Sequence, residues 1–138
     1  MDKSLNYLAL ARKAGCAELG EEPVGAITRT GKGYLVVVAG DASDHTWRRA
    51  KSFVAGTSQQ CVRLACTKEE LGFVVGRTSL AIAAITDAPL ALALVKSLGE
   101  PEKYKEAIAV LEEKTKKLKK RQSEAKAHQR NVRMGKKK

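Results

Sequence analysis

The chain has 138 residues, 43% of them hydrophobic, and its 26 Lys and Arg residues against 15 Asp and Glu residues give a net charge of +11. A length near 140 residues predicts one domain with a single hydrophobic core, and this apolar content excludes global disorder. The charge is uneven, because residues 1–113 hold 14 basic and 14 acidic side chains, whereas residues 114–138 hold 12 basic and one acidic. We therefore expect a neutral folded part and a strongly basic C-terminal part.

The apolar stretches and the cysteines indicate in which compartment of the cell the protein resides. The longest apolar stretch, residues 80–95, is interrupted by polar residues and a proline. A spanning helix needs roughly 18 uninterrupted apolar residues. The first residues lack the long apolar region of a secretion signal. Cys16, Cys61 and Cys66 are odd in number and lack a metal or redox spacing, so we expect buried reduced thiols. These features predict a cytoplasmic protein that does not bind a membrane.

Helical and strand patterns alternate along residues 4–98. The helical segments repeat apolar residues every three or four positions and end at a glycine, and Thr67 with Glu70 has the pattern of a capping box. The β-branched run 34–39 is typical of a strand buried on both faces of a sheet. The expected elements are a helix over 4–14, a short alternating segment over 16–19, a helix over 21–30, a strand over 34–39, a helix ending near Gly56, a short apolar run over 61–66, a short helix over 67–76, a strand over 80–86 and a helix over 87–98.

This alternation predicts an α/β fold for residues 1–99. We expect a three-layer α/β/α sandwich, in which helices cover both faces of a mixed, mainly parallel sheet of about four strands. A separate charged helix is expected over residues 100–125, followed by a disordered basic tail over residues 126–138. The helix has a thin apolar stripe that either docks on the domain or pairs with a partner helix. The stripe consists of Tyr104, Ile108, Leu111 and Leu118.

No catalytic or metal-binding pattern stands out. The glycines of residues 25–33 have the wrong spacing for a phosphate loop, and they follow a helix instead of a strand. The two histidines have no metal-ligand spacing with the cysteines. The aspartates at expected strand-to-helix junctions stand where Asp routinely caps a helix. We therefore expect no enzyme activity, no metal, no cofactor and no small-molecule substrate.

The basic C-terminal part is the strongest functional signal from composition. Dense Lys and Arg residues displace counterions from nucleic-acid phosphates, which gives affinity without sequence preference. The alternative is a solvated charged face that only aids solubility. The residues expected to contact phosphates nonspecifically are Lys116, Lys117, Lys119, Lys120, Arg121, Arg130 and Arg133.

Four separated motifs occur in order within residues 5–98. They are LALARKAG at residues 8–15, GEE at residues 20–22, TKEELG at residues 67–72 with Gly76 after it, and AITD at residues 84–87. Together they resemble the ribosomal L-seven-Ae/L-thirty-e superfamily, with the closest likeness to its bacterial YlxQ-like branch. The resemblance implies an α/β/α sandwich that binds kink-turn RNA, and it does not cover the basic tail.

The resemblance also implies a contact surface made of two segments. One is the start of the second helix, and the other is the loop before the last strand, where an apolar side chain at Leu80 would cover a splayed base. Basic side chains around the same edge would restore a positive field. The implied contact residues are Gly20, Glu21, Glu22, Pro23, Arg77, Thr78, Ser79 and Leu80, with Arg12, Lys13 and Lys32 around them.

These observations favour a noncatalytic RNA-binding protein of the ribosome or the translation machinery. Its expected partners are structured RNA of the kink-turn kind, ribosomal RNA and neighbouring ribosomal proteins. One alternative is a protein-interaction module that uses the helix of residues 104–118. Another is an accessory RNA-recognition domain of a modifying enzyme.

Overall fold

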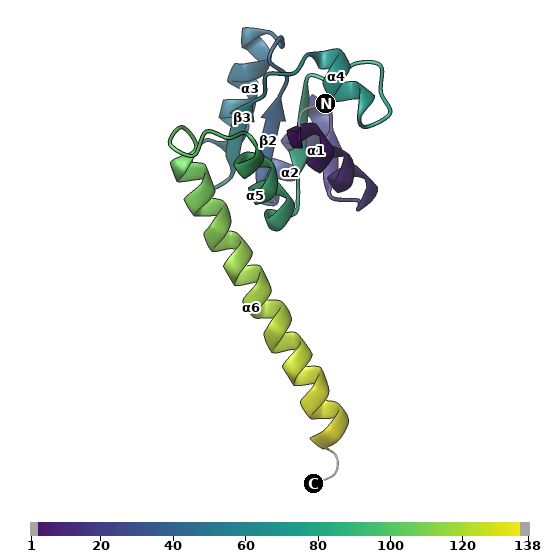
Figure 1. Cartoon of the computed structure of the whole chain (residues 1–138), viewed down its shortest axis with the longest axis vertical. Helices are drawn as coiled ribbons and strands as arrows, with labels where there is room; N and C mark the ends of the chain where they lie inside the picture. Colours follow the sequence, from purple (N-terminus) through teal and green to yellow (C-terminus); the bar gives the residue numbers. More distant parts are fainter. Residues whose placement is uncertain (1–2, 136–138) are drawn as a thin grey trace.

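The computed structural model describes the backbone of residues 3–135 and the side chains of residues 3–125. Helices and strands alternate in the first 98 residues, as the sequence predicts, and a long helix extends away from this α/β unit (Figure 1). In chain order the elements are α1 (Lys3–Lys13), β1 (Ala17–Leu19), α2 (Glu21–Arg29), β2 (Leu35–Val38), α3 (Asp44–Val54), β3 (Gln60–Arg63), α4 (Lys68–Phe73), β4 (Ile82–Ile85), α5 (Ala88–Ser97) and α6 (Lys105–Gly135).

The four strands form one mixed sheet in the order β1-β4-β2-β3. Strands β2 and β4 are central and buried along their whole length, which confirms the prediction from the β-branched run. The expected mainly parallel sheet is wrong, because β4 pairs antiparallel with both β1 and β2, and only β2 and β3 are parallel. When strands and helices alternate and consecutive strands pair with each other, the paired strands are parallel. Here the last strand, β4, lies between β1 and β2 instead.

The helices fall into two packed groups. Helix α1 packs against α5, and α5 against α6, whereas α2 packs against α3. Figure 1 draws α1 and α5 on the near side of the sheet and α2 on the far side. These groups favour the three-layer sandwich, which itself stays a prediction.

Side-chain caps mark the starts of several helices. The predicted capping box is confirmed, because Thr67 Oγ1 accepts from the Glu70 amide (3.1 Å) and Glu70 Oε1 accepts from the Thr67 amide (2.9 Å). Asp87 caps α5 by accepting from the Leu90 amide (3.0 Å). Ser43 caps α3. These caps fix where α3 and α4 begin at one end of the sheet and where α5 begins at the other.

Helix α6 is longer than the sequence predicts. Its backbone is helical from Lys105 to Gly135, past the expected boundary at residue 125. The physical reason is composition, since residues 122–134 contain neither glycine nor proline and include several strong helix formers. Residues 136–138 of the expected tail lie outside the described residues. Among the described helices, none combines the length and apolarity that crossing a bilayer demands.

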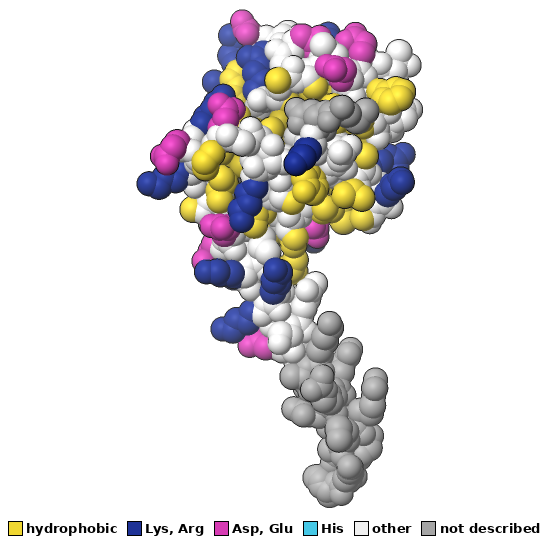
Figure 2. All heavy atoms as spheres, in the orientation of Figure 1, with side chains coloured by type: hydrophobic (Ala, Val, Ile, Leu, Met, Phe, Trp, Pro, Cys, Tyr) yellow, Lys and Arg dark blue, Asp and Glu magenta, His cyan; other side chains and the backbone are white. Residues whose placement is uncertain are grey.

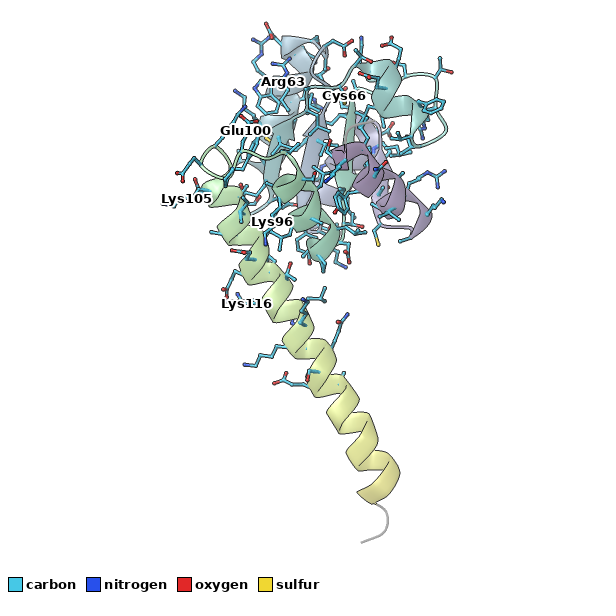
Figure 3. All side chains as sticks on the ribbon, viewed as in Figure 1. Arg63, Cys66, Lys96, Glu100, Lys105 and Lys116 are labelled. Carbon is cyan, nitrogen blue, oxygen red and sulfur yellow. The ribbon has the colours of Figure 1, made fainter. Side chains whose placement is uncertain are left out.

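The first half of α6 docks on α5. Leu111 is 1% exposed, and Ala107 and Thr115, one turn away on either side, are also buried. Lys96 Nζ of α5 lies 3.4 Å from Glu112 Oε2 of α6, and Figure 3 shows Lys96 directed at this part of the helix. Of the apolar stripe, Leu111 is buried and Tyr104 and Ile108 pack against the core, so this part of the stripe is used inside the chain.

Candidate nucleic-acid interface

The start of α2 is one of the two segments that the resemblance implies for RNA contact. Gly20 precedes the helix with φ +99°, which residues with a Cβ rarely adopt, and no side chain caps the helix there. The first amides of α2 are therefore open to an acceptor, and the helix dipole favours a negatively charged one. The Gly20 N–H donates to the carbonyl oxygen of Ile82 at 3.0 Å, which places this helix start beside the start of β4.

The second segment is the loop that leads into β4. Arg77, Thr78 and Ser79 are exposed, and the loop reaches β4 within three residues. Leu80 is 5% exposed, and its amide donates to the Lys68 carbonyl at 3.0 Å. The expectation that Leu80 covers a splayed base is therefore wrong, because its side chain already fills the protein core.

A glycine in α4 lets this loop take its position. An added Cβ on Gly72 would lie 2.8 Å from the Ser79 nitrogen and 2.9 Å from the Arg77 carbonyl oxygen, closer than real Cβ contacts allow. The Gly72 carbonyl also accepts from the Arg77 amide at 2.8 Å. The loop is thus held against α4 by its backbone. Because both segments flank Ile82, the structure brings the start of α2 and the exposed loop to the same end of the sheet.

The acidic side chain at the start of α2 has a basic partner. Arg49 Nε of α3 donates to Glu21 Oε1 at 2.6 Å, and both side chains are about half exposed. The same guanidinium lies 4.9 Å from the ring centre of Phe53. Solvent screening makes such an exposed pair a small contribution to stability. The guanidinium offsets the negative charge of Glu21 at the start of α2.

A groove between α2 and α3 adjoins this ion pair. It has a volume of about 440 Å³, and Arg29, Arg49 and Phe53 line it together with Glu22 and the small residues of α2. Two guanidinium groups and an aromatic ring are groups that bind phosphates and stack on bases. The sequence did not point to Arg49 and Phe53, since nothing local links α3 to α2 across 28 positions, and it gave no signal for Arg29 at the far end of α2.

Three of the expected basic residues lie at the other end of the sheet. Ile85, the last residue of β4, pairs with Ala17 at the start of β1 and with Leu35 at the start of β2. Arg12 and Lys13 end the helix before β1, and Lys32 lies just before β2. They are therefore near the Ile85 end, whereas Gly20 is at the Ile82 end. The expectation from the resemblance that they surround the same edge is wrong, because Arg12 and Lys13 precede β1 whereas Gly20 follows it, and Lys32 precedes β2, whose first residue pairs with Ile85.

The basic residues of α6 form a separate surface. Figure 2 shows Lys and Arg side chains over α3 and along the described part of α6. The expected phosphate contacts at residues 116, 117, 119, 120 and 121 are all exposed, and Figure 3 shows Lys116 on the part of α6 that leads away from the domain. The backbone at Arg130 and Arg133 is helical, and their side chains lie outside the described residues.

The remaining chemistry-bearing groups do not form a further centre. Within residues 3–125, no group of three or more His, Cys, Asp or Glu side chains is arranged to hold a metal ion. Cys66 is buried as expected, but Cys16 and Cys61 are partly exposed, which corrects the prediction of three buried thiols. Asp41, at the end of β2, accepts from the Lys68 amide at 2.8 Å and so helps to position α4.

Comparisons with known proteins establish the fold. No family model matches the sequence, and a search of curated proteins finds no match. A solved structure of a protein of unknown function from Bacillus halodurans is similar with a TM-score of 0.67 and 24% identity, covering 72% of this chain and 100% of that one. The 15.5kD RNA binding protein of Giardia lamblia is similar with a TM-score of 0.58 and 18% identity, covering 70% of this chain and 82% of that one. At these identities the likeness is one of fold, and the α/β domain of this chain shares it with both proteins.

Proposed function

We propose that the chain is a noncatalytic, cytoplasmic RNA-binding protein of the translation machinery that recognises kink-turn-like RNA. The observation that carries the proposal is that the open start of α2, bonded to β4 through Gly20 and Ile82, lies at the end of the sheet where the exposed loop 77–79 leads into β4. The fold shared with the Giardia RNA binding protein supports an RNA partner. The basic face of α6 supplies nonspecific attraction to phosphates, from ribosomal RNA among others.

The two segments have complementary roles. The amides of α2 donate to phosphate or base acceptors, and the hydroxyls of Thr78 and Ser79 and the guanidinium of Arg77 can donate from the loop. A straight duplex presents its phosphates on a regular cylinder, whereas a kinked RNA exposes base edges and unstacked nucleotides. Two adjoining donor segments at one end of the sheet therefore favour the kinked form.

The test compares two RNAs of equal length, one with a kink-turn and one a straight duplex. We expect the kinked RNA to bind the full chain at least about tenfold more tightly, a difference of about 1.4 kcal/mol. Fluorescence anisotropy at about 0.1 M salt measures both dissociation constants. Equal affinities would contradict the kink-turn part, and absence of binding to either RNA would contradict RNA binding itself.

The substitution Arg77→Gln tests the loop. We expect affinity for the kinked RNA to fall about three- to tenfold, because one charge-assisted contact is lost, while the straight duplex binds nearly as before. Arg12→Gln is the matched control, since it removes the same charge at the opposite end of the sheet. If both substitutions weaken kinked RNA equally, the loop has no special role.

The substitution Arg49→Gln tests the ion pair at α2. Without its partner, Glu21 repels phosphate, so we expect affinity for kinked RNA to fall several-fold, while the free energy of unfolding changes by less than about 1 kcal/mol. Arg48→Gln removes a neighbouring exposed charge on α3 as the control. Adding Glu21→Gln to Arg49→Gln is expected to restore most of the affinity. Failure of this double variant to recover would show that Arg49 acts by another route.

A further inference from the structure

Strand β3 is an open edge of the sheet. Its only neighbour in the strand order is β2, to which it is parallel. The Gln60 amide donates to the Tyr34 carbonyl at 3.1 Å and the Leu64 amide to the Val38 carbonyl at 2.8 Å. Alternate residues of a strand point their backbone groups in opposite directions. The N–H and C=O groups of Cys61 and Arg63 therefore point away from β2, toward the outside of the sheet.

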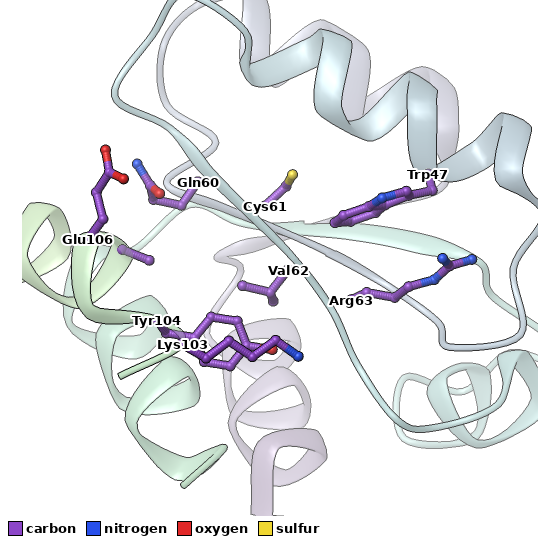
Figure 4. Close-up of a pocket in the computed structure, with 9 residues that line it drawn as sticks. Trp47, Gln60, Cys61, Val62, Arg63, Lys103, Tyr104 and Glu106 are labelled. Atoms are coloured by element: carbon purple, nitrogen blue, oxygen red, sulfur yellow. The ribbon is translucent and has the colours of Figure 1, made fainter. Parts of the chain in front are cut away.

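A groove of about 360 Å³ follows this open edge. Figure 4 shows β3 crossing it, with the Trp47 ring of α3 on one side and the side chains of Lys103 and Tyr104 on the other. Burial raises the pKa of the Cys61 thiol, although the Lys51 ammonium opposes this, so the thiol is a neutral group of the lining. The aromatic walls and the strand between them form a slot with hydrogen-bonding groups at its base.

A second hollow continues the groove along the chain. It has a volume of about 430 Å³, it shares Arg63, Lys103 and Tyr104 with the first, and it extends past Leu64 and Ala65. The two hollows together follow residues 60–65. Six extended residues cover roughly 20 Å at about 3.3 Å each. The shape thus fits an extended chain better than a compact ligand.

Arg63 is incompletely satisfied within this groove. Its Nη2 donates to the Ala42 carbonyl at 2.8 Å, and its guanidinium lies 5.6 Å from the Trp47 ring centre. Its Nε is buried and has no acceptor among the described residues. A buried donor without an acceptor loses the free energy of hydration and gains nothing in return. The Arg63 side chain as a whole is only partly buried and lines both hollows, so a carboxylate in the groove can approach its exposed part.

The charges around the groove favour an acidic occupant. The Lys51 Nζ lies 5.6 Å from the centre of the Trp47 ring, and the Lys103 Nζ lies 5.3 Å from the centre of the Tyr104 ring. Within the lining itself, Arg63 and Lys103 are matched by two carboxylates, Glu100 and Glu106. Lys51, beside the Trp47 ring, adds one further cation next to the groove.

We propose that the groove along β3 binds an extended, acidic peptide of a protein partner, which adds as a fifth strand to the open edge. A polypeptide offers alternating N–H and C=O groups that match those of Cys61 and Arg63, and its side chains point alternately to the two aromatic walls. A phosphodiester backbone matches poorly, since phosphate oxygens only accept and would face the outward carbonyls of β3. Carboxylates of the peptide pair with Arg63 and Lys103.

The only tryptophan of the chain, Trp47, reports directly on occupancy of the groove through its fluorescence. The full chain is titrated with a blocked hexapeptide of alternating glutamate and valine. A peptide of alternating lysine and valine tests the charge, the glutamate peptide N-methylated at alternate amides tests the backbone hydrogen bonds, and octauridylate tests RNA as the occupant. We expect the glutamate peptide to shift the emission of Trp47 saturably. The lysine peptide and the N-methylated peptide are expected to bind at least about tenfold more weakly.

Variants separate the groove from general electrostatics. Arg63→Gln is expected to weaken the glutamate peptide about tenfold. Arg12→Gln removes the same charge beside β1, the opposite edge of the sheet, and is expected to leave binding unchanged. The proposal is overturned if the glutamate and lysine peptides bind equally well, or if N-methylation or Arg63→Gln leaves the affinity unchanged. It is also overturned if only octauridylate changes the Trp47 emission, or if no probe does. These outcomes do not depend on whether the α2 surface binds kinked RNA.

Discussion

Removing residues 119–138 is expected to weaken binding to every RNA by about two orders of magnitude at about 0.1 M salt. The segment holds nine basic residues and one acidic residue, and no basic residue in it belongs to the α2 surface. Each phosphate contact that is lost flattens the dependence of log affinity on log salt by about 0.9 for a duplex. If about half of the nine cations contact phosphates, the slope becomes less steep by about four.

The place of the cut matters for this experiment. A chain that ends at Leu118 keeps the buried residues Leu111 and Thr115 and the ion pair between Lys96 and Glu112, so α6 stays docked on α5. The free energy of unfolding should therefore change little, and thermal denaturation checks this. The ratio of affinities for kinked and straight RNA is expected to stay the same. If the truncated chain binds kinked and straight RNA equally well, the preference for kinked RNA comes from α6 and not from the start of α2.

The elements themselves could be predicted from the sequence because their causes are local. The capping box of Thr67 and Glu70 involves residues three positions apart, and the buried strand at residues 35–38 shows directly as a β-branched run. The order and direction of the strands have no such local cause. The insertion of β4 between β1 and β2 depends on how all layers pack, so the expected parallel sheet was wrong.

For the candidate site too, the sequence indicated the segments but not how they are arranged in space. Its two segments, at residues 20–23 and 77–79, follow from motifs that resemble a known family. In the structure Gly20 bonds to Ile82 at the start of β4, and the loop 77–79 leads into the same strand. The expected position of Arg12, Lys13 and Lys32 rested on the resemblance alone, and the pairing of Ile85 with Ala17 and Leu35 puts them at the opposite end of the sheet. The resemblance implied that Leu80 covers a base, yet its side chain is buried, as the apolar run over residues 80–86 had indicated. The Glu21–Arg49 pair arises from helix packing, which no spacing rule reveals.

The substitution Gly72→Ala is expected to separate stability from recognition at the loop before β4. The new methyl group would collide with backbone atoms of Arg77 and Ser79, which cannot move away by a side-chain rotation. The loop must shift as a unit, so the free energy of unfolding should fall by about 1–3 kcal/mol. The shift also moves Arg77 and Thr78 relative to the start of α2. We therefore expect the preference for kinked RNA to fall at least about tenfold, while the nonspecific attraction of α6 remains.

Gly31→Ala is the matched control for this change. Gly31 has φ +79°, so alanine is strained there by about 1–2 kcal/mol, but an added Cβ meets nothing within 4 Å. It also follows the C-terminal end of α2, away from Gly20. The control should therefore lose comparable stability, measured by urea denaturation, and keep its preference for kinked RNA. If both glycine variants lose the preference in proportion to their stability, the loop matters only for folding, and the contact surface proposed for residues 77–79 is wrong.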